Sequence, residues 1–211
     1  MELYFAPLAC SMATRIALYE AGADAVFHAV DLRAKRLDDG ADFRAVNPMG
    51  QVPALRTDAG DLVTENPVVL QVVADTYPQA HLAPPAGSER YRLQQWLNFI
   101  TSELHKLVFN PLLDPRSNDG AKAYARDKAE QRFAYLDAQL AGRAFVLDRF
   151  SIADCYLVTV LNWARFAGIE LARWPAVQSY FEGLQQRPSV AKAMAEELAL
   201  YKAEQARRSA A

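Results

Sequence analysis

The 211-residue sequence is poor in cysteine, lacks an excess of either charge and has no long apolar run. Its two cysteines, Cys10 and Cys155, stand too far apart to suggest a disulfide-stapled miniprotein, so each is interpreted as a thiol. The 23 Lys and Arg residues against 25 Asp and Glu residues give a formal net charge of −2, and no basic cluster predicts a nucleic-acid partner. The sequence shows neither a signal-peptide pattern nor the roughly 18 uncharged apolar residues of a membrane span. We therefore expect a cytoplasmic protein with no nucleic-acid or membrane partner.

The first 77 residues carry the patterns of an α/β domain. Short apolar and β-branched runs alternate with helical patterns, and the segment Asp58-Ala59-Gly60-Asp61 is typical of a hairpin turn. The order is a βαβ unit, a short connection and then a ββα unit. The predicted elements in chain order are strand 3–5, helix 11–21, strand 25–31, strands 54–56 and 62–64, and helix 67–74.

Residues 78–87 are rich in proline and glycine and have the composition of an interdomain linker. From residue 88 onward strand patterns vanish and apolar residues recur at helical spacing. We therefore predict a first domain over residues 1–77, the linker over 78–87 and an all-helical domain over 88–211.

The two cysteines are predicted to play different parts. Cys10 stands where the first strand passes into the first helix, where unpaired backbone N–H groups and the helix dipole lower a thiol pKa below about 8.5. A buried structural cysteine is the alternative there. The next residue, Ser11, is interpreted either as a cap of the helix or as a donor to a bound sulfur. Cys155 follows a capping-box pattern, Ser151 with Asp154, and is predicted to lie in the core.

Two further segments of the first domain have a special backbone pattern. Val52-Pro53 precedes a strand, and a cis bond there would leave the Val52 backbone able to pair with an extended peptide, although the sequence leaves cis and trans open. Glu65-Asn66 opens a helix, where a carboxylate and an amide can bind an amino-acid-like ligand. Asn66 before Pro67 is also a good helix cap, which is the alternative interpretation.

In the second domain, Asn98, Ser102 and His105 stand at i, i+4 and i+7 and would share one face of an α-helix. His105 is the histidine with polar neighbours on a helical face, which makes it a candidate site residue. Glu103 and Lys106 flank it and are interpreted as solvated charges unless a ligand engages them.

Taken together, these segments resemble a bacterial glutathione S-transferase of the beta class. The Val-Pro and Ser-Ile-Ala-Asp elements belong to the wider superfamily, whereas Cys10 with His105-Lys106 marks the beta class. The resemblance runs over almost the whole chain. It implies a thioredoxin-like N-terminal domain, an all-helical C-terminal domain, and a homodimer with one glutathione site per chain at the cleft between the domains. It implies no bound cofactor or metal, because glutathione is a co-substrate.

The resemblance also implies roles for individual residues. Cys10 would lie against the glutathione sulfur, often as a mixed disulfide, with Ser11 beside it. Glu103 would reach the glutathione of the neighbouring subunit. The residues implied to bind glutathione are Cys10, Lys35 for the glycyl carboxylate, Val52 for the cysteinyl unit, Glu65 and Asn66 for the γ-glutamyl end, and Asn98, Glu103, His105 and Lys106.

The sequence departs from the family pattern at three of these positions or near them. Asn66 stands where the family usually has serine, Arg15 where this class commonly has histidine, and Met49 where a basic residue is frequent. Asn66 keeps the hydrogen-bonding ability of the serine but has a longer side chain. Neither Arg15 nor Met49 removes a group that the proposed chemistry requires.

Three functions follow from this resemblance. The leading one is conjugation of glutathione to small hydrophobic electrophiles, catalysed by Cys10, Ser11 and His105. The second is thiol-disulfide reduction or peroxidase activity through a Cys10 mixed disulfide. The third is a non-catalytic interaction protein on the same fold, similar to stringent starvation proteins, against which the presence of Cys10, Lys35, Glu65 and His105 argues.

Overall fold

The computed structural model describes residues 1–209, which form two compact units. The first unit consists of Met1–Leu82 together with the chain from Pro188 onward, and the second consists of Ala83–Arg187. No helix among residues 1–209 combines the length and the apolar character that crossing a membrane demands.

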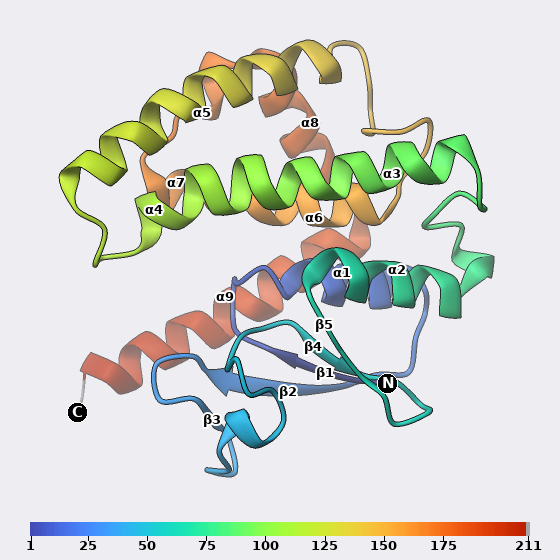
Figure 1. Cartoon of the computed structure of the whole chain (residues 1–211), viewed down its shortest axis with the longest axis vertical. Helices are drawn as coiled ribbons and strands as arrows, with labels where there is room; N and C mark the ends of the chain where they lie inside the picture. The colour runs from blue at the N-terminus through green and yellow to red at the C-terminus, as the bar shows by residue number, and fades with distance from the viewer. Residues whose placement is uncertain (210–211) are drawn as a thin grey trace. The chain divides into compact units, whose positions relative to one another are not determined.

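A five-stranded sheet forms the centre of the first unit (Figure 1). Its order is β3-β2-β1-β4-β5, with β1 parallel to β2 and the other neighbours antiparallel. All the predicted strands are confirmed. The two-residue β3 is an additional strand that the sequence pattern does not predict. The strands are β1 (Glu2–Phe5), β2 (Val26–Asp31), β3 (Arg36–Leu37), β4 (Ala54–Arg56) and β5 (Leu62–Thr64).

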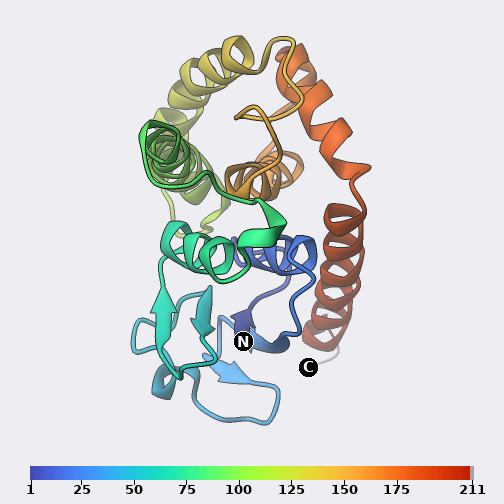
Figure 2. The ribbon, with the colours of Figure 1, turned by 90° about the vertical axis from the view of Figure 1, so that its right-hand side faces the viewer.

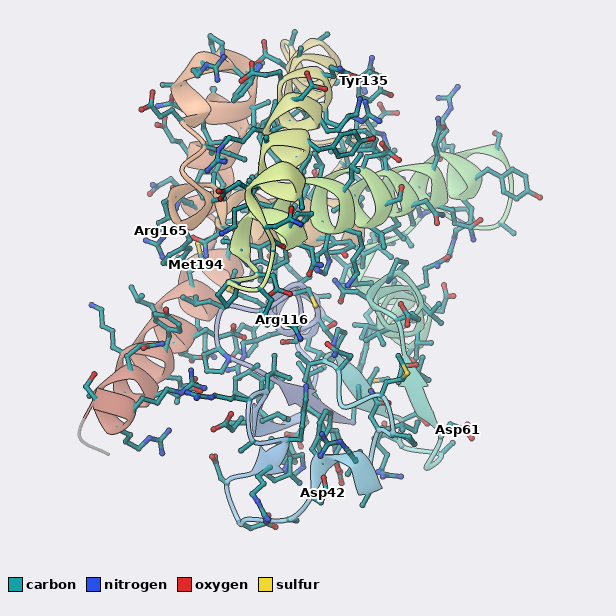
Figure 3. All side chains as sticks on the ribbon, turned by 60° about the vertical axis from the view of Figure 1, so that its left-hand side comes forward. Asp42, Asp61, Arg116, Tyr135, Arg165 and Met194 are labelled. Atoms are coloured by element: carbon teal, nitrogen blue, oxygen red, sulfur yellow. The ribbon has the colours of Figure 1, made fainter. Side chains whose placement is uncertain are left out.

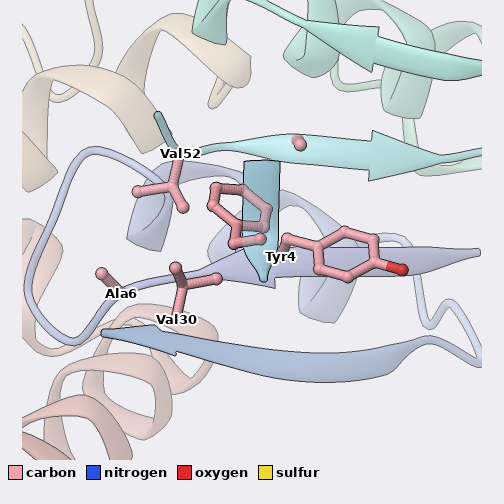
Figure 4. Packing of buried hydrophobic residues seen from close by; sticks show 6 residues of the cluster. Tyr4, Ala6, Val30 and Val52 are labelled. Carbon is pink, nitrogen blue, oxygen red and sulfur yellow. The ribbon is translucent and has the colours of Figure 1, made fainter. Parts of the chain in front are cut away.

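The alternation of side chains along β1 explains how the sheet buries both faces. Tyr4 points to the face where Val30, Phe43 and Val52 form an apolar cluster (Figure 4). Leu3 and Phe5 point to the other face and are equally buried, because successive side chains of a strand alternate. A strand covered on both faces reads as a continuous apolar run, as Leu3-Tyr4-Phe5 does.

Helices α1 (Met12–Glu20) and α2 (Asn66–Thr76) lie side by side on one face of this sheet (Figures 1 and 2). Short 3-10 turns stand at η1 (Phe43–Ala45) and η2 (Pro78–Ala80), the second of them in the predicted linker. The βαβ and ββα order of the sequence reading is therefore confirmed, and the first unit has the expected thioredoxin-like arrangement.

The last helix, α9 (Pro188–Ser209), packs along α1 and belongs to the first unit (Figure 2). The sequence predicts this segment as part of the helical domain 88–211, because helical periodicity alone does not reveal the surface against which a helix packs. In the structure Arg15 and Tyr19 of α1 both contact Glu196 of α9. The predicted domain boundaries thus describe the order along the chain, while the compact units divide it differently.

The second unit consists of helices joined by loops, and residues 83–187 form no strand, as predicted. Its first long helix continues through a π-helical stretch, η3, before it ends at Leu113. On its surface Trp96, Phe99 and Tyr135 form an aromatic cluster, with Tyr135 on α5 (Figure 3). The elements are α3 (Ser88–Phe99), η3 (Ile100–Phe109), α4 (Asn110–Leu113), α5 (Asp119–Leu140), α6 (Ile152–Leu161), α7 (Ala164–Ala167), η4 (Leu171–Arg173) and α8 (Pro175–Gln185).

Helix α6 is the buried centre of the second unit, and all ten of its residues are buried. The predicted capping box is confirmed: Ser151 N and Oγ donate to Asp154 Oδ2 at 2.8 and 2.9 Å. Asp154 Oδ1 accepts from Val146 N at 2.9 Å and from the Tyr180 hydroxyl at 2.7 Å. Cys155, the next residue, is completely buried, which confirms its prediction as a core residue.

Replacement of Asp154 by alanine is expected to destabilise the second unit severely. The substitution leaves several buried donors without an acceptor, and each such group costs about 1–3 kcal/mol. We expect the free energy of unfolding, measured by urea denaturation, to fall by about 3–5 kcal/mol. Asp148→Ala is the matched control, since Asp148 is exposed and surface substitutions change stability by about 0.5 kcal/mol or less. Equal losses in the two variants would contradict the structural role of Asp154.

Candidate active site

The first unit presents a thiol at the start of a helix. Strand β1 ends at Phe5, α1 begins at Met12, and Cys10 lies in the loop between them, as predicted. Its side chain is partly exposed, and its thiol donates to the carbonyl oxygen of Val52 at 3.2 Å. The sulfur lies near the start of α1, where the helix dipole favours a thiolate, whereas the bond to the Val52 carbonyl favours the protonated thiol.

Ser11 closes this loop from within. It occupies the N-cap position of α1, but its side chain does not cap the helix, so that interpretation is wrong. The hydroxyl instead accepts from Ala6 N at 3.2 Å and contacts Ala6 O at 3.4 Å. The αR backbone of Ser11 turns the hydroxyl back towards Ala6, and the side chain is completely buried. Ser11 therefore holds together the loop that carries Cys10, and its predicted contact with a bound sulfur stays a prediction.

The Val52–Pro53 peptide bond is cis, which settles the alternative that the sequence left open. The two residues stand directly before β4, and Val52 supplies the carbonyl that faces the Cys10 thiol. The preceding turn is tied by Asn47, whose Nδ2 donates to Gln51 O at 2.7 Å. This segment is thus held at a fixed place beside the cysteine.

The start of α2 differs from the predicted cap. Glu65, not Asn66, is the N-cap residue, and Asn66 is the first residue of the helix. The Asn66 amide is turned inward: Nδ2 donates to Cys10 O at 3.2 Å, and Oδ1 accepts from Thr14 Oγ1 at 3.4 Å. Asn66 therefore ties α2 to the cysteine, while the Glu65 side chain is exposed and available to a ligand.

Lys35 lies beside the same segment. Its Nζ donates to Gly50 O at 2.8 Å, and a Cβ at Gly50 would stand 3.1 Å from Lys35 Cδ. Gly50 has a φ of 59°, so both its backbone conformation and the lysine stem above it require glycine. Because an ammonium group has three donors, Lys35 can still bind an anionic group there.

Left-handed backbone conformations gather around this site. Within residues 1–209, four non-glycine residues have positive φ, and Leu8, Lys35 and Glu65 are three of them. Such conformations cost about 1–3 kcal/mol each and cluster at functional sites. Their presence at Lys35 and Glu65 accords with a binding role for these residues.

Helix α9 reaches the cysteine loop through a buried carboxylate. Glu197 Oε2 accepts from Leu8 N at 2.7 Å, and Arg15 Nε lies 3.0 Å from Glu197 Oε1, an ion-pair distance without hydrogen-bond alignment. The Arg15 guanidinium stands 4.1 and 4.2 Å from the ring centroids of Phe5 and Phe27. Burial raises the pKa of Glu197 to about 8, while Arg15 and the Leu8 N–H act in the opposite direction. Arg15, which stands where the beta class commonly has histidine, therefore pairs its guanidinium with the buried carboxylate of Glu197.

In the second unit His105 lies on η3, and the assumed α-helical face is wrong there. The stretch Ile100–Phe109 is a π-helix, with hydrogen bonds from i to i+5, so the i, i+4, i+7 spacing does not describe one face. Asn98 and Ser102 are exposed and bond locally, Asn98 Nδ2 to Gln94 O and Ser102 Oγ to Asn98 O. Isolated π-helical turns are frequent at functional sites.

His105 is held by aromatic side chains of α6 and its end. Its Nδ1 lies 2.7 Å from the hydroxyl of Tyr156, and its ring meets Trp163 edge-on with 4.9 Å between centroids. Burial, with a smaller effect of the Lys106 charge, lowers the pKa of His105 to about 3. The imidazole is therefore neutral over the physiological range.

The two charged neighbours of His105 differ in their surroundings. Glu103 Oε2 accepts from Arg132 Nε at 2.8 Å and Nη2 at 2.7 Å, so the carboxylate is paired within the second unit. Lys106 is exposed. The part-buried pair of Glu103 and Arg132 was not foreseen, because Arg132 lies on another helix, α5.

Sequence reasoning missed Glu197 and Tyr156, and each had left a signal. Glu197 continues the buried stripe of Val190 and Ala193, where a charged residue on an apolar face calls for a partner. Tyr156 stands in a helix that is apolar nearly all round, and a buried phenol needs a hydrogen-bond partner. Neither signal names the partner, because both partners lie on other elements.

Comparison with known proteins gives consistent matches to one family. Residues 9–76 match the model for the N-terminal domain of glutathione S-transferases, and residues 100–188 match that for the C-terminal domain. The chain is 40% identical over 199 residues to glutathione S-transferase GstA of Escherichia coli O157:H7, covering 93% of this chain and 98% of that protein.

Solved structures agree with these matches. A sphingomonad glutathione S-transferase complexed with glutathione is 45% identical with a TM-score of 0.89, covering 93% of this chain and 98% of that one. A ternary complex of BphK, a bacterial glutathione S-transferase, is 44% identical with a TM-score of 0.90, covering 93% and 99%. The beta-class glutathione S-transferase of Sphingomonas chungbukensis is 42% identical with a TM-score of 0.89, covering 93% and 98%.

A thioredoxin-like unit with a cysteine at the start of its first helix, followed by a helical unit, defines a class of thiol-handling enzymes. The chain belongs to the glutathione S-transferase family. It is a glutathione transferase similar to the bacterial beta class.

Replacement of Glu197 by alanine is expected to lower the free energy of unfolding by about 1–3 kcal/mol, because the buried Arg15 guanidinium keeps Glu196 but loses Glu197 as a partner. The same change removes the acceptor of Leu8 N, two residues before Cys10. Urea denaturation measures the loss, and Lys202→Ala, an exposed position on α9, is the control with an expected change of about 0.5 kcal/mol or less. A loss in Glu197→Ala no larger than that of the control would refute the role of this carboxylate.

His105 is expected to make the protein acid-sensitive. Its folded pKa lies below the ordinary value of 6.5, so its contribution is complete above pH 6.5 and declines as the pH falls towards about 3. The unfolded chain takes up a proton in this range and the folded chain does not, at a cost of up to about 1.4 kcal/mol per pH unit. Urea denaturation at several pH values should give His105→Gln a shallower acid decline than the wild type.

The control for this pH series is His81→Asn, which removes an exposed histidine and keeps a residue that tolerates the left-handed conformation found there. Its acid decline should match that of the wild type. An acid decline in His105→Gln as steep as in the wild type would show that His105 titrates alike in the folded and unfolded chains.

Proposed function

We propose that the chain conjugates the sulfur of glutathione to small hydrophobic electrophiles. The observation that carries this proposal is the partly exposed Cys10 thiol at the start of α1, 3.2 Å from the Val52 carbonyl and joined through its own carbonyl to Asn66. The related sphingomonad transferase is solved in complex with glutathione. Glutathione is a co-substrate here, and the chemistry needs no further cofactor.

The first unit would bind glutathione by its charged and backbone groups. The Lys35 ammonium would pair with the glycyl carboxylate, and the Val52 backbone would bond the cysteinyl unit as an added strand does. Glu65 would receive the γ-glutamyl ammonium, and the N-terminus of α2, which begins at Asn66, would receive the γ-glutamyl carboxylate. This arrangement would bring the glutathione sulfur to Cys10.

The second unit would contribute Asn98, His105 and Lys106 to the same ligand. His105 is neutral at physiological pH, so it would act on the sulfur by a hydrogen bond. We further propose a cytoplasmic homodimer in which Glu103 reaches the glutathione of the partner subunit, at the cost of its pairing with Arg132.

Catalysis would start from a thiolate. The α1 dipole would lower the pKa of a thiol bound there, with Ser11 holding the loop in shape. The glutathione sulfur would then form a bond to an electrophilic carbon, and the leaving group would depart with its electron pair. The electrophile would be small and apolar.

A second function, thiol-disulfide reduction, is favoured by the partial exposure of Cys10. The Cys10 thiolate would attack the glutathione sulfur of a glutathionylated substrate, form a Cys10–glutathione disulfide and release the substrate as its thiolate. A glutathione thiolate would then attack the bound glutathione sulfur, form glutathione disulfide and release the Cys10 thiolate. Both functions use the same residues.

Incubation with glutathione disulfide followed by intact-mass measurement tests the Cys10 site. We expect one glutathionyl adduct on the wild type and on Cys155→Ala, none on Cys10→Ala, and complete reversal by dithiothreitol. The reason is that Cys10 is partly exposed at a helix start, whereas Cys155 is buried. No adduct on the wild type, or an adduct on Cys155, would exclude the proposed site.

Rates then separate the candidate functions. A panel of electrophiles measures conjugation, and a glutathionylated peptide measures reduction, both with Cys10→Ala as the reference. Conjugation that exceeds reduction supports the transferase. Turnover of neither substrate class, with glutathione still bound, would support a non-catalytic interaction protein.

A further inference from the structure

Outside the groups assigned above, the strongest feature of the second unit is the partner of His105. Tyr156 lies on α6, is completely buried, and its hydroxyl stands 2.7 Å from His105 Nδ1. The Tyr156 ring meets the imidazole at 87°, and Trp163 meets it from another side at 70°. These contacts therefore fix both the position and the orientation of the His105 imidazole.

This contact bears on which nitrogen carries the imidazole proton. A neutral imidazole has one N–H donor and one acceptor nitrogen, and burial keeps His105 neutral. A buried phenol is a hydrogen-bond donor, and 2.7 Å is the length of a good bond from its hydroxyl to Nδ1. When Nδ1 accepts, the proton stands on Nε2, since the bond at one ring nitrogen sets the state of the other.

We propose that Tyr156 is a positioning residue that holds His105 as the Nε2–H tautomer, so that His105 offers a hydrogen-bond donor to the glutathione sulfur. This inference rests on the proposed function only for the identity of the sulfur ligand. A thiolate accepts hydrogen bonds, and an N–H donor stabilises it without taking its proton. In the other tautomer, Nε2 would present a lone pair to the sulfur and would repel the thiolate.

The anchoring of α6 makes Tyr156 suited to this task. The capping box of Ser151 and Asp154 fixes the start of α6 at Ile152, four residues before Tyr156. Every residue of α6 is buried, so the helix has little room to shift its tyrosine. Side chains that position a catalytic group need such a rigid support.

Nitrogen-15 NMR of the histidine side chains reads the tautomer directly. We expect wild-type His105, assigned by its loss in His105→Gln, to be the Nε2–H form at neutral pH. In Tyr156→Phe the imidazole loses the donor at Nδ1, and a mixture of the two tautomers should appear. Tyr180→Phe is the matched control, because it removes another buried tyrosine hydroxyl of this unit, bonded to Asp154. It should leave the His105 signals unchanged.

Steady-state kinetics with glutathione and a reactive aromatic electrophile give the second readout. We expect Tyr156→Phe to lower kcat about 3- to 10-fold and to change the KM for glutathione less than 2-fold, because binding groups are untouched and only the donor to the sulfur is affected. Tyr180→Phe should stay within 2-fold of the wild type in both constants. A thermal melt of each variant, with rates measured well below the transition, separates these effects from loss of fold.

The outcomes test the tautomer of His105 separately from its role at the glutathione sulfur. A wild-type His105 in the Nδ1–H form overturns the proposal, whether or not Tyr156→Phe folds. An unchanged tautomer in folded Tyr156→Phe, or equal kinetic losses in Tyr156→Phe and Tyr180→Phe, also overturns it. If instead the tautomer shifts while His105→Gln keeps full activity, the tautomer assignment holds and the role of His105 at the sulfur fails.

Discussion

The first unit depends on a short loop that is closed by hydrogen bonds from separate parts of the chain. Ser11 bonds Ala6 inside the loop, Asn66 of α2 binds the Cys10 carbonyl, and Glu197 of α9 accepts from Leu8 N. Each bond satisfies a polar group that burial would otherwise leave costly. Because the bonds come from α2, from α9 and from the loop itself, the position of the sulfur is determined by the whole unit.

The helices and strands of this protein could be predicted from the sequence more fully than the contacts between them. Strand alternation, turn residues and the Ser151 capping pattern are local, so β1, β2, β4, β5 and α6 were foreseen. The packing of α9 against α1 was not foreseen, because the periodicity of an amphipathic helix does not show which element it packs against. The cap at Asn66 failed for a related reason: the amide had a long-range acceptor, the Cys10 carbonyl, that competed with local capping.

The same distinction holds for the candidate site. Cys10 was found from its place between a strand and a helix, which is a local signal, whereas Lys35 came only from family resemblance and Glu65 from its place at a helix start together with that resemblance. Their positive φ values mark them in the structure, yet lysine and glutamate carry no sequence sign of that conformation. His105 was selected for the polar neighbours of an α-helical face, but η3 is a π-helix, so the geometry behind the selection was wrong, and the role of His105 stays a prediction.

The surroundings of Cys10 in the first unit and of His105 in the second favour opposite charge states. At Cys10 the start of α1 supplies a helix dipole, which favours the charged form of a thiol. Around His105 the chain supplies aromatic rings and burial, which favour the neutral form of an imidazole. In the proposed function, a neutral N–H donor from His105 would stabilise a thiolate and leave the negative charge on the sulfur. An imidazolium would weaken the same sulfur as a nucleophile, so a neutral His105 would suit the proposed reaction.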